Sequence, residues 1–265
     1  MLHSEIYNSD QMSLPLTERS AAYGDGVFTT AKIVDGKIEA LDKHLERLSL
    51  SCAKLAIPIN DEGLNAHLIK LASAHQLAVL KVMVTAGEGG RGYSRKGCCS
   101  EKILITVHEY PNHYKAWQEN GIVLGKADTQ LGINPQLAGI KHLNRLEQVL
   151  VRAELDERQE DDLLVSNCQG NVIEVSAGNI FWYDAAKQQW QTPSLTNSGV
   201  DGLKRQEILN KIPNCAIVET SIDQLIDVNA MFICNSVMGV VPVSRFIDNE
   251  MNVEIVNNAI NEFNL

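Results

Sequence analysis

The sequence has no apolar run that approaches the roughly 18 consecutive apolar residues of a membrane-spanning helix. Residues 1–16 also lack the basic segment and following apolar segment that are typical of a secretory signal peptide. Basic residues are too few for a surface that binds phosphate backbones, since 23 Lys and Arg stand against 33 Asp and Glu. We therefore expect a cytoplasmic protein with neither a membrane nor a nucleic-acid partner.

The sequence also lacks the cysteine spacings of metal and redox sites. It has six cysteines but no CxxC motif and no His-Cys pattern with the spacing of zinc ligands. We expect these residues to be reduced thiols rather than a disulfide framework, and we expect no metal: Cys52, Cys98, Cys99, Cys168, Cys215 and Cys234.

The chain of 265 residues is long enough for two domains with sizeable cores. Residues 1–110 predict a small α/β domain. It begins with a hairpin in which Val27–Val34 and Lys37–Leu41 flank the turn Asp35-Gly36. The further elements expected are a helix capped by Asp42 that ends before Pro58, a helix over Glu62–His75, a strand over Ala78–Thr85, a glycine-rich loop over Gly87–Gly97, and a strand over Lys102–Val107.

A shift to proline, asparagine and charge indicates a linker over residues 111–120. Residues 121–265 then predict a larger domain. Its expected elements are strands at Ile122–Lys126, Asp162–Ser166, Val172–Val175, Ile180–Tyr183 and Ala230–Cys234, a helix after Lys141, and a helix over Leu203–Lys211.

The most informative segment is LAGIKHLNRLEQVLVR, which spans residues 137–152. Lys141 follows a short run of small and apolar residues, so partial desolvation is expected to lower its pKa and favour the free amine that condenses with carbonyl groups. An amphipathic helix follows, with Asn144 as its predicted N-cap and Glu147 three residues later. Its predicted apolar face carries Leu146, Val149, Leu150 and Ala153. Taken alone, a lysine at a helix entrance is usually a solvated surface group.

Several segments together carry a family resemblance. They are YGDGVFTTAKIVDGK, the helix with His44 and Arg47, the segment around Lys141, and QGNVIEVSAGNIFWY, which contains Glu174. From about Glu18 to Val243 the chain resembles the fold-type IV pyridoxal-phosphate enzymes, which include the branched-chain and D-amino acid aminotransferases. GIKHLNRLEQVL and GGRGYS are most similar to the aminodeoxychorismate lyases of this group.

The resemblance implies a two-domain α+β or α/β fold of the D-amino acid aminotransferase type, with pyridoxal 5′-phosphate between the domains of a homodimer. It implies that Lys141 binds the cofactor covalently, that Glu174 faces the nitrogen of the pyridine ring, and that Arg47 in the motif H-x-x-R-L binds the phosphate. From the local pattern alone, the simpler interpretations are an outward-facing strand residue at Glu174 and a helix-surface charge at Arg47.

Two further segments resemble phosphate-binding elements of the family. In GVDGLKRQ, the backbone N–H groups of Leu203 and Lys204 stand where a helix begins, a position that favours anions. Aminotransferases often have threonine in place of Lys204, so only the backbone contribution is carried over. Asn235 and Ser236 follow a strand and offer a hydroxyl and a backbone amide, although a plain turn explains them equally well.

The expected substrate has two carboxylates, which call for cations. We nominate Arg91 and Arg145, with Tyr93, His142 and Asn144 as supporting donors. The alternatives are a solvated loop arginine at position 91 and an intrahelical ion pair at position 145.

The resemblance implies a lyase that converts 4-amino-4-deoxychorismate into pyruvate and 4-aminobenzoate, a folate precursor, with Lys141 as the base. One alternative is a branched-chain or D-amino acid aminotransferase of the same fold. The other is a non-catalytic binding or scaffold protein in which Lys141, Glu174 and Arg47 are scattered surface charges.

Overall fold

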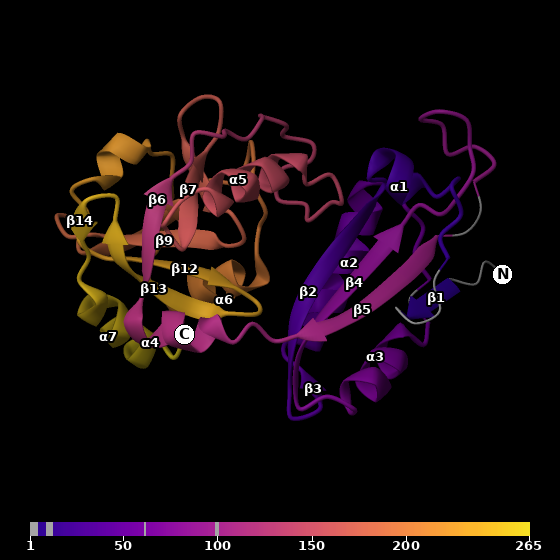
Figure 1. Cartoon of the computed structure of the whole chain (residues 1–265), viewed down its shortest axis with the longest axis horizontal. Coiled ribbons are helices and arrows are strands. Elements are labelled where there is room, and N and C mark those ends of the chain that lie inside the picture. Colours follow the sequence, from indigo (N-terminus) through magenta and orange to yellow (C-terminus); the bar gives the residue numbers. More distant parts are fainter. Residues whose placement is uncertain (1–4, 9–12, 61, 99–100) are drawn as a thin grey trace. The chain divides into compact units, whose positions relative to one another are not determined.

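The computed structural model describes residues 5–8, 13–60, 62–98 and 101–265 (Figure 1). The chain forms two compact units. Unit 1 comprises Met1–Tyr110 and Lys141–Asn144, and unit 2 comprises Pro111–Ile140 and Arg145–Leu265. The first segment of unit 1 ends at Tyr110, and the short segment that contains Lys141 also belongs to unit 1, whereas the sequence placed it with the larger domain.

The sheet of unit 1 has five strands in the order β1-β5-β4-β2-β3. All neighbours are antiparallel except β1 and β5, which are parallel. The strands are β1 (Glu5–Asn8), β2 (Gly26–Val34), β3 (Lys37–Ile38), β4 (Leu77–Thr85) and β5 (Lys102–Glu109). The helices are α1 (Arg19–Tyr23), α2 (Leu41–Lys54) and α3 (Leu64–Ala72).

The hairpin turn between β2 and β3 has the conformation that its residues predict. Asp35 and Gly36 both have positive φ, 50° and 75°, as a tight two-residue hairpin requires. The returning strand is shorter than expected, because Ala40 adopts a left-handed conformation and helix α2 begins at Leu41. The prediction that Asp42 is the N-cap is therefore wrong. Asp42 lies in the first helical turn, where its negative charge interacts favourably with the helix dipole.

Helix α2 packs against β2. The apolar residues Leu48 and Cys52 are buried, and so are the polar residues His44 and Ser51. Arg47 lies on the same helix and is half-buried. Helix α2 therefore carries three polar or charged side chains that are wholly or partly removed from solvent: His44, Arg47 and Ser51.

The sheet of unit 2 has nine strands, eight of them in the order β11-β10-β9-β12-β13-β6-β7-β8, with β14 paired to β13. The strands are β6 (Ile122–Lys126), β7 (Asp162–Ser166), β8 (Val172–Val175), β9 (Asn179–Asp184), β10 (Gln189–Pro193), β11 (Ala216–Val218), β12 (Met231–Asn235), β13 (Gly239–Phe246) and β14 (Asn249–Glu250). The helices are α4 (His113–Asn120), α5 (Leu146–Asp156), α6 (Leu203–Lys211), the 3-10 helix η1 (Ile222–Leu225) and α7 (Val253–Phe263).

Helices cover this sheet through three buried apolar clusters. One contains Phe181 and Phe232, stacked with ring centroids 4.9 Å apart, together with residues of α6 and α7. A second is contacted by Tyr114 and Trp117 of α4, so the expected linker of residues 111–120 is largely a helix that packs on unit 2. The third joins α5 to β7.

Helix α5 differs from its prediction at both its start and its buried face. Its N-cap is Arg145, not Asn144, whose side chain instead donates a hydrogen bond of 3.1 Å to the carbonyl of Gly24. Val151 and Leu155 are its buried residues. The predicted face is solvent-exposed in the chain: Leu146 77%, Val149 59% and Leu150 59%, with Ala153 also exposed.

Within the described ranges, every helix is too short or too polar to cross a lipid bilayer. Five cysteines in these ranges are free thiols, and Cys99 lies outside them. The same ranges contain no group of three His, Cys, Asp or Glu side chains with metal-binding geometry.

Candidate active site

The segment that carries Lys141 is fixed to strand β2 by backbone hydrogen bonds. Phe28 N donates to Lys141 O over 2.9 Å, and Leu143 N donates to Gly26 O over 2.9 Å. These bonds form an antiparallel bridge between Val27 and His142. A Cβ at position 26 would lie 2.5 Å from the carbonyl oxygen of Val84, so only glycine permits this approach. Lys141 is therefore held by the sheet of unit 1.

The ammonium of Lys141 lies over an aromatic ring. Its Nζ is 4.5 Å from the centroid of Phe28, within the range of a cation–π contact. The sequence alone does not indicate this contact, because an aromatic residue in a strand next to YGDGV is most simply interpreted as a core residue. The contact gives Lys141 a defined side-chain direction, which a solvated surface lysine lacks.

Arg47 belongs to a short hydrogen-bonded chain between α2 and β2. Its Nη2 donates to Thr29 Oγ1, and the same hydroxyl lies 2.6 Å from Nδ1 of His44. The hydroxyl of Thr29 thus bonds to both Arg47 and His44, and the tautomer of His44 sets which atom donates in the second bond. The motif H-x-x-R thus supplies both an arginine and part of its support. Thr29 was missed, because nothing in a strand threonine signals a buried network.

Burial lowers the pKa of His44 to about 3 from its ordinary 6.5, and the charge of Arg47 acts in the same direction. His44 is therefore neutral at physiological pH. It adds no positive charge beside Arg47.

Glu174 is buried in strand β8, so it is not the outward-facing residue that the local pattern allowed. Its Oε2 accepts a 2.9 Å hydrogen bond from Val200 N, and its Oε1 accepts from Gln148 Nε2 at 3.3 Å. These two donors fix the plane of the carboxylate. Gln148 lies on α5 and was missed, because one polar residue within an apolar helical pattern carries no local signal.

The turn that donates to Glu174 also holds the residues before Lys141. Gly139 N donates to Gly199 O over 3.0 Å, and Asp201 N donates to Gly139 O over 3.2 Å. Gly199 has φ of 84°, and a Cβ there would lie 2.5 Å from Ile173 Cγ2. Glycine at position 199 is therefore required both by conformation and by space.

Leu203 is the first residue of α6, after an extended Gly202 with no side-chain cap. The first N–H groups of a helix have no partner within it, so those of Leu203 and Lys204 are suited to an anion. Lys204 Nζ is 3.1 Å from both carboxylate oxygens of Glu207 on the same helix. The side chain of Lys204 thus forms an ion pair within α6, which leaves only its backbone N–H as the group that the resemblance assigns to phosphate binding.

Asn235 ends strand β12 and builds the turn that follows. Its Oδ1 accepts from the N–H groups of Val237 and Met238, each at 2.8 Å, and its Nδ2 donates to Ala177 O. The side chain of Asn235 therefore stabilises the turn. The hydroxyl of Ser236, which was predicted to contact an anion, lies within this turn.

Arg91 and Tyr93 lie in the loop between β4 and β5, and both are exposed. The ring of Tyr93 lies 5.5 Å from that of Tyr23, centroid to centroid. The carbonyls of this loop are held by Arg19, a residue that the sequence analysis did not single out. No local feature marks Arg19, since a charged residue between Glu18 and Ser20 is ordinary on a surface.

Arg145 is the N-cap residue of α5. Its Nη2 donates to Ile140 O over 2.8 Å. Burial lowers the pKa of Arg145, against the opposing effects of Glu174 and Glu147. Arg145 belongs to unit 2, whereas His142 and Asn144 belong to unit 1.

Comparison with known proteins identifies the family. Residues 26–246 match the family described as amino-transferase class IV. The chain belongs to this family. It is 38% identical over 239 residues to the aminodeoxychorismate lyase of Vibrio harveyi, with 88% of both chains covered. The crystal structure of 4-amino-4-deoxychorismate lyase from Pseudomonas aeruginosa is similar with a TM-score of 0.86 and 30% identity, over 96% of this chain and 97% of that one.

Class IV aminotransferases use pyridoxal phosphate. A hypothetical aminotransferase from Mycobacterium tuberculosis, solved in its PLP-bound form, shares the fold with a TM-score of 0.80 at 15% identity, over 96% of this chain and 93% of that one. The residues present here fit such a cofactor. Unit 1 offers an oriented lysine and a supported arginine, and unit 2 offers a buried carboxylate that accepts from two N–H donors, which are the kinds of group that pyridoxal phosphate requires.

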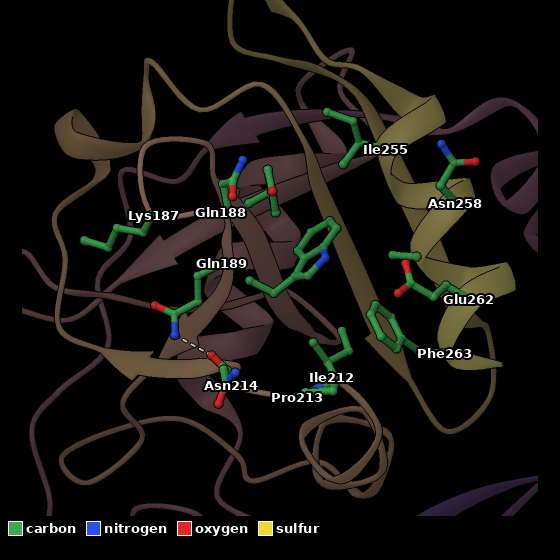
Figure 2. A pocket seen from close by; sticks show the side chains of 13 residues that line it. Lys187, Gln188, Gln189, Ile212, Pro213, Asn214, Ile255, Asn258, Glu262 and Phe263 are labelled. Carbon is green, nitrogen blue, oxygen red and sulfur yellow. Dashed lines mark hydrogen bonds between the residues drawn. The ribbon is translucent and has the colours of Figure 1, made fainter.

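A separate open groove lies in unit 2, with a volume of about 710 Å³ (Figure 2). Trp190, Ile255 and Phe263 contribute apolar surface, and a hydrogen bond from Gln189 to the carbonyl of Asn214 closes one side. None of the residues nominated for the cofactor or the substrate lines this groove.

Proposed function

We propose that this chain is a pyridoxal-phosphate-dependent lyase that converts 4-amino-4-deoxychorismate into 4-aminobenzoate and pyruvate. The observation that carries the proposal is the lysine segment KHLN, which is fixed to β2 by two backbone hydrogen bonds and directs Lys141 Nζ over Phe28. The 38% identity with the Vibrio harveyi lyase supports this choice within the family.

Six groups would hold the cofactor. Lys141 would bind it covalently, Glu174 would face its ring nitrogen, and Arg47, the N–H groups of Leu203 and Lys204, and the Asn235-Ser236 turn would bind its phosphate. When bound, pyridoxal phosphate supplies a protonated ring that withdraws electrons from the carbon next to the substrate amine. Glu174 favours that protonated ring, because a buried carboxylate stabilises a neighbouring positive charge.

The reaction requires a base at C4 of the substrate, the carbon that carries the amine. Lys141 Nζ takes the C4 proton, and the C–O bond of the adjacent enolpyruvyl group breaks. The ring becomes aromatic as 4-aminobenzoate, and the released enolpyruvate takes up a proton to become pyruvate. A base positioned in this way contributes typically about 10²- to 10⁴-fold in rate.

The two substrate carboxylates would be bound by Arg91 and Arg145, with Tyr93, His142 and Asn144 as further donors. Guanidinium groups suit this task because their paired N–H donors match the two oxygens of a carboxylate. An enolpyruvyl carboxylate and a ring carboxylate then fix which face of C4 meets the base.

We further propose that the enzyme is a cytoplasmic homodimer. The exposed face of α5, formed by Leu146, Val149 and Leu150, supports a dimer, because three large apolar side chains side by side on one helix are costly to leave in water. A second copy of the chain is the occupant proposed for this α5 face.

The direct test supplies 4-amino-4-deoxychorismate to the purified holoenzyme and measures both products. The lyase yields 4-aminobenzoate and pyruvate in equal amounts. A parallel reaction with a branched-chain or D-amino acid and 2-oxoglutarate tests the aminotransferase alternative. Amino-group exchange without 4-aminobenzoate would overturn the lyase assignment in favour of that alternative.

Lys141→Ala should abolish turnover together with the visible absorbance of the bound cofactor, because one side chain serves both as attachment point and as base. Borohydride reduction of the native enzyme, followed by peptide mass mapping, should place the reduced cofactor on Lys141. Lys43→Ala is the matched control, since Lys43 is an exposed lysine of unit 1 that contacts Glu46. Cofactor mapped to another lysine would refute the assignment.

A further inference from the structure

The loop between β4 and β5 folds around a single guanidinium group. Four carbonyl oxygens of Gly89–Ser94 accept hydrogen bonds from Arg19. Nη1 donates to Gly89 O, Gly92 O and Ser94 O at 3.4, 3.1 and 3.2 Å, and Nη2 donates to Tyr93 O at 3.2 Å. Arg19 comes from α1, some 70 residues earlier in the chain. The planar fork of arginine, with its five N–H donors, suits such convergent carbonyls.

Arg19 is buried, with 3% of its surface exposed, and a carboxylate compensates its charge. Its Nε donates to Asp25 Oδ2 at 2.7 Å, and Asp25 also accepts from Arg95 at the end of the same loop. Burial acts to raise the pKa of Asp25, but the hydrogen bonds from Arg95 and Arg19 outweigh it, so this pKa lies below its ordinary value. Asp25 therefore stays ionised at neutral pH, and the network keeps its charges.

The backbone of the loop Gly89–Ser94 packs closely against itself and against Arg19. A Cβ at Gly90 would lie 2.2 Å from Ser94 O and 3.1 Å from Arg19 Nη1, so the backbone passes too close for any side chain. The guanidinium of Arg19 also stacks on Tyr23, at 4.9 Å from the ring centroid, and Tyr23 in turn contacts Tyr93. The backbone on both sides of Arg91 is thus fixed, while the side chain of Arg91 extends into solvent.

We propose that Arg19 is a positioning residue that fixes the loop Gly89–Ser94 in the conformation that presents Arg91 to a carboxylate of the substrate. This inference rests on the proposed function, and it adds a residue that does not itself touch the substrate. A loop held in its binding conformation before the substrate arrives loses little entropy on binding, so the effect belongs to substrate affinity.

The experiment compares Arg19→Met with the wild-type holoenzyme by steady-state kinetics and by limited trypsin digestion. Arg91 lies inside the loop and is itself a trypsin site. The variant should raise KM about tenfold with kcat changed less than about twofold, which corresponds to the loss of about one hydrogen bond to a charged group. Cleavage after Arg91 should be faster by a similar factor. Lys43→Met, which removes an exposed ion pair of the same unit, is the matched control.

Faster cleavage together with a raised KM supports the proposal. Faster cleavage with an unchanged KM overturns it, because the loop would then be held only for stability, and unchanged cleavage overturns it as well. If Arg19→Met does not fold, Arg19→Lys replaces it, since lysine keeps the charge beside Asp25 but cannot reach four carbonyls, and its KM should also rise. Wild-type enzyme that releases no 4-aminobenzoate would instead refute the proposed function, whatever the digestion shows.

Discussion

At the scale of single residues, three buried polar side chains belong to or support the candidate site: Glu174 is itself nominated, His44 hydrogen-bonds to the partner of Arg47, and Arg19 holds the loop that carries Arg91. His44, Glu174 and Arg19 are at most 5% exposed, although polar residues of these types are mostly found at protein surfaces. A buried polar group is costly unless it is hydrogen-bonded, and each of the three bonds to a group at least 15 residues away in the sequence. The fold determines such partners, so the local sequence pattern does not reveal that these residues are buried and hydrogen-bonded.

His44 makes a testable contribution to the pH dependence of stability. Its pKa is about 3 in the folded chain, below the ordinary 6.5 of the unfolded chain, so the unfolded chain takes up the proton first as the pH falls. Between about pH 6.5 and pH 3 this residue should therefore lower the free energy of unfolding by up to about 1.4 kcal/mol per pH unit. Above pH 6.5 it should have no effect.

His44→Asn provides the measurement. The side-chain amide of asparagine can donate to or accept from Thr29 in place of Nδ1 of His44, but asparagine does not titrate in this range. Urea unfolding at a series of pH values should show a shallower acid loss for the variant than for the wild type, with the two curves parallel above pH 6.5. Parallel curves throughout the acid range would show that His44 is not buried in its neutral form.

At the scale of elements, the N-terminus of helix α6 supplies the backbone N–H groups that are proposed to bind the phosphate. Helix α6 begins at Leu203 after Gly202, whose ψ of 142° is extended. A Cβ at position 202 would lie 2.2 Å from Asn179 Oδ1, so glycine is required for the chain to turn into the helix at this point. The bounds of α6, Leu203–Lys211, agree with the prediction from the sequence because its cap, turn and first residues are consecutive.

Leu203→Pro should weaken cofactor binding by about tenfold, as expected for the loss of one hydrogen bond to a phosphate. Proline removes the N–H of residue 203 but is tolerated at the first helical position, and extended Gly202 meets the requirement of the residue before a proline. Titration of the apoenzyme with pyridoxal phosphate, followed by absorbance, measures the change, with Leu203→Ala as control. Equal affinities for the two variants would remove this N–H from the phosphate site.

At the scale of the whole molecule, each unit has its own sheet and its own core. The chain passes from unit 1 to unit 2 after Tyr110, returns for Lys141–Asn144, and leaves again at Arg145. The lysine expected to bind the cofactor therefore belongs to the sheet of unit 1, while Glu174 belongs to that of unit 2. The sequence assigned both to one domain, because four residues inside a long segment give no signal of a change of unit.

The proposed dimer predicts that Leu150→Lys yields a monomer in sedimentation velocity experiments, because a charge on the α5 face cannot be buried without a partner. Leu50→Lys is a matched control, since Leu50 on α2 is 60% exposed and Leu150 is 59% exposed. The control should sediment as the wild-type dimer does. A Leu150→Lys protein that remains dimeric would place the interface elsewhere on the molecule.

The sequence by itself determined the features that depend on neighbours in the chain. Strands β2, β4 and β6, the Asp35-Gly36 turn and helix α6 follow from alternation, turn residues and helix punctuation, which act over a few residues. The tertiary structure alone decided the N-cap of α5, which of its faces is buried, and the partners of Lys141, Glu174 and Arg19. Each of these depends on groups far apart in sequence, as in the bond from Asn144 to Gly24 across 120 residues. Periodicity records which residues prefer to be buried, but the partner that buries or binds them is fixed only when distant segments meet.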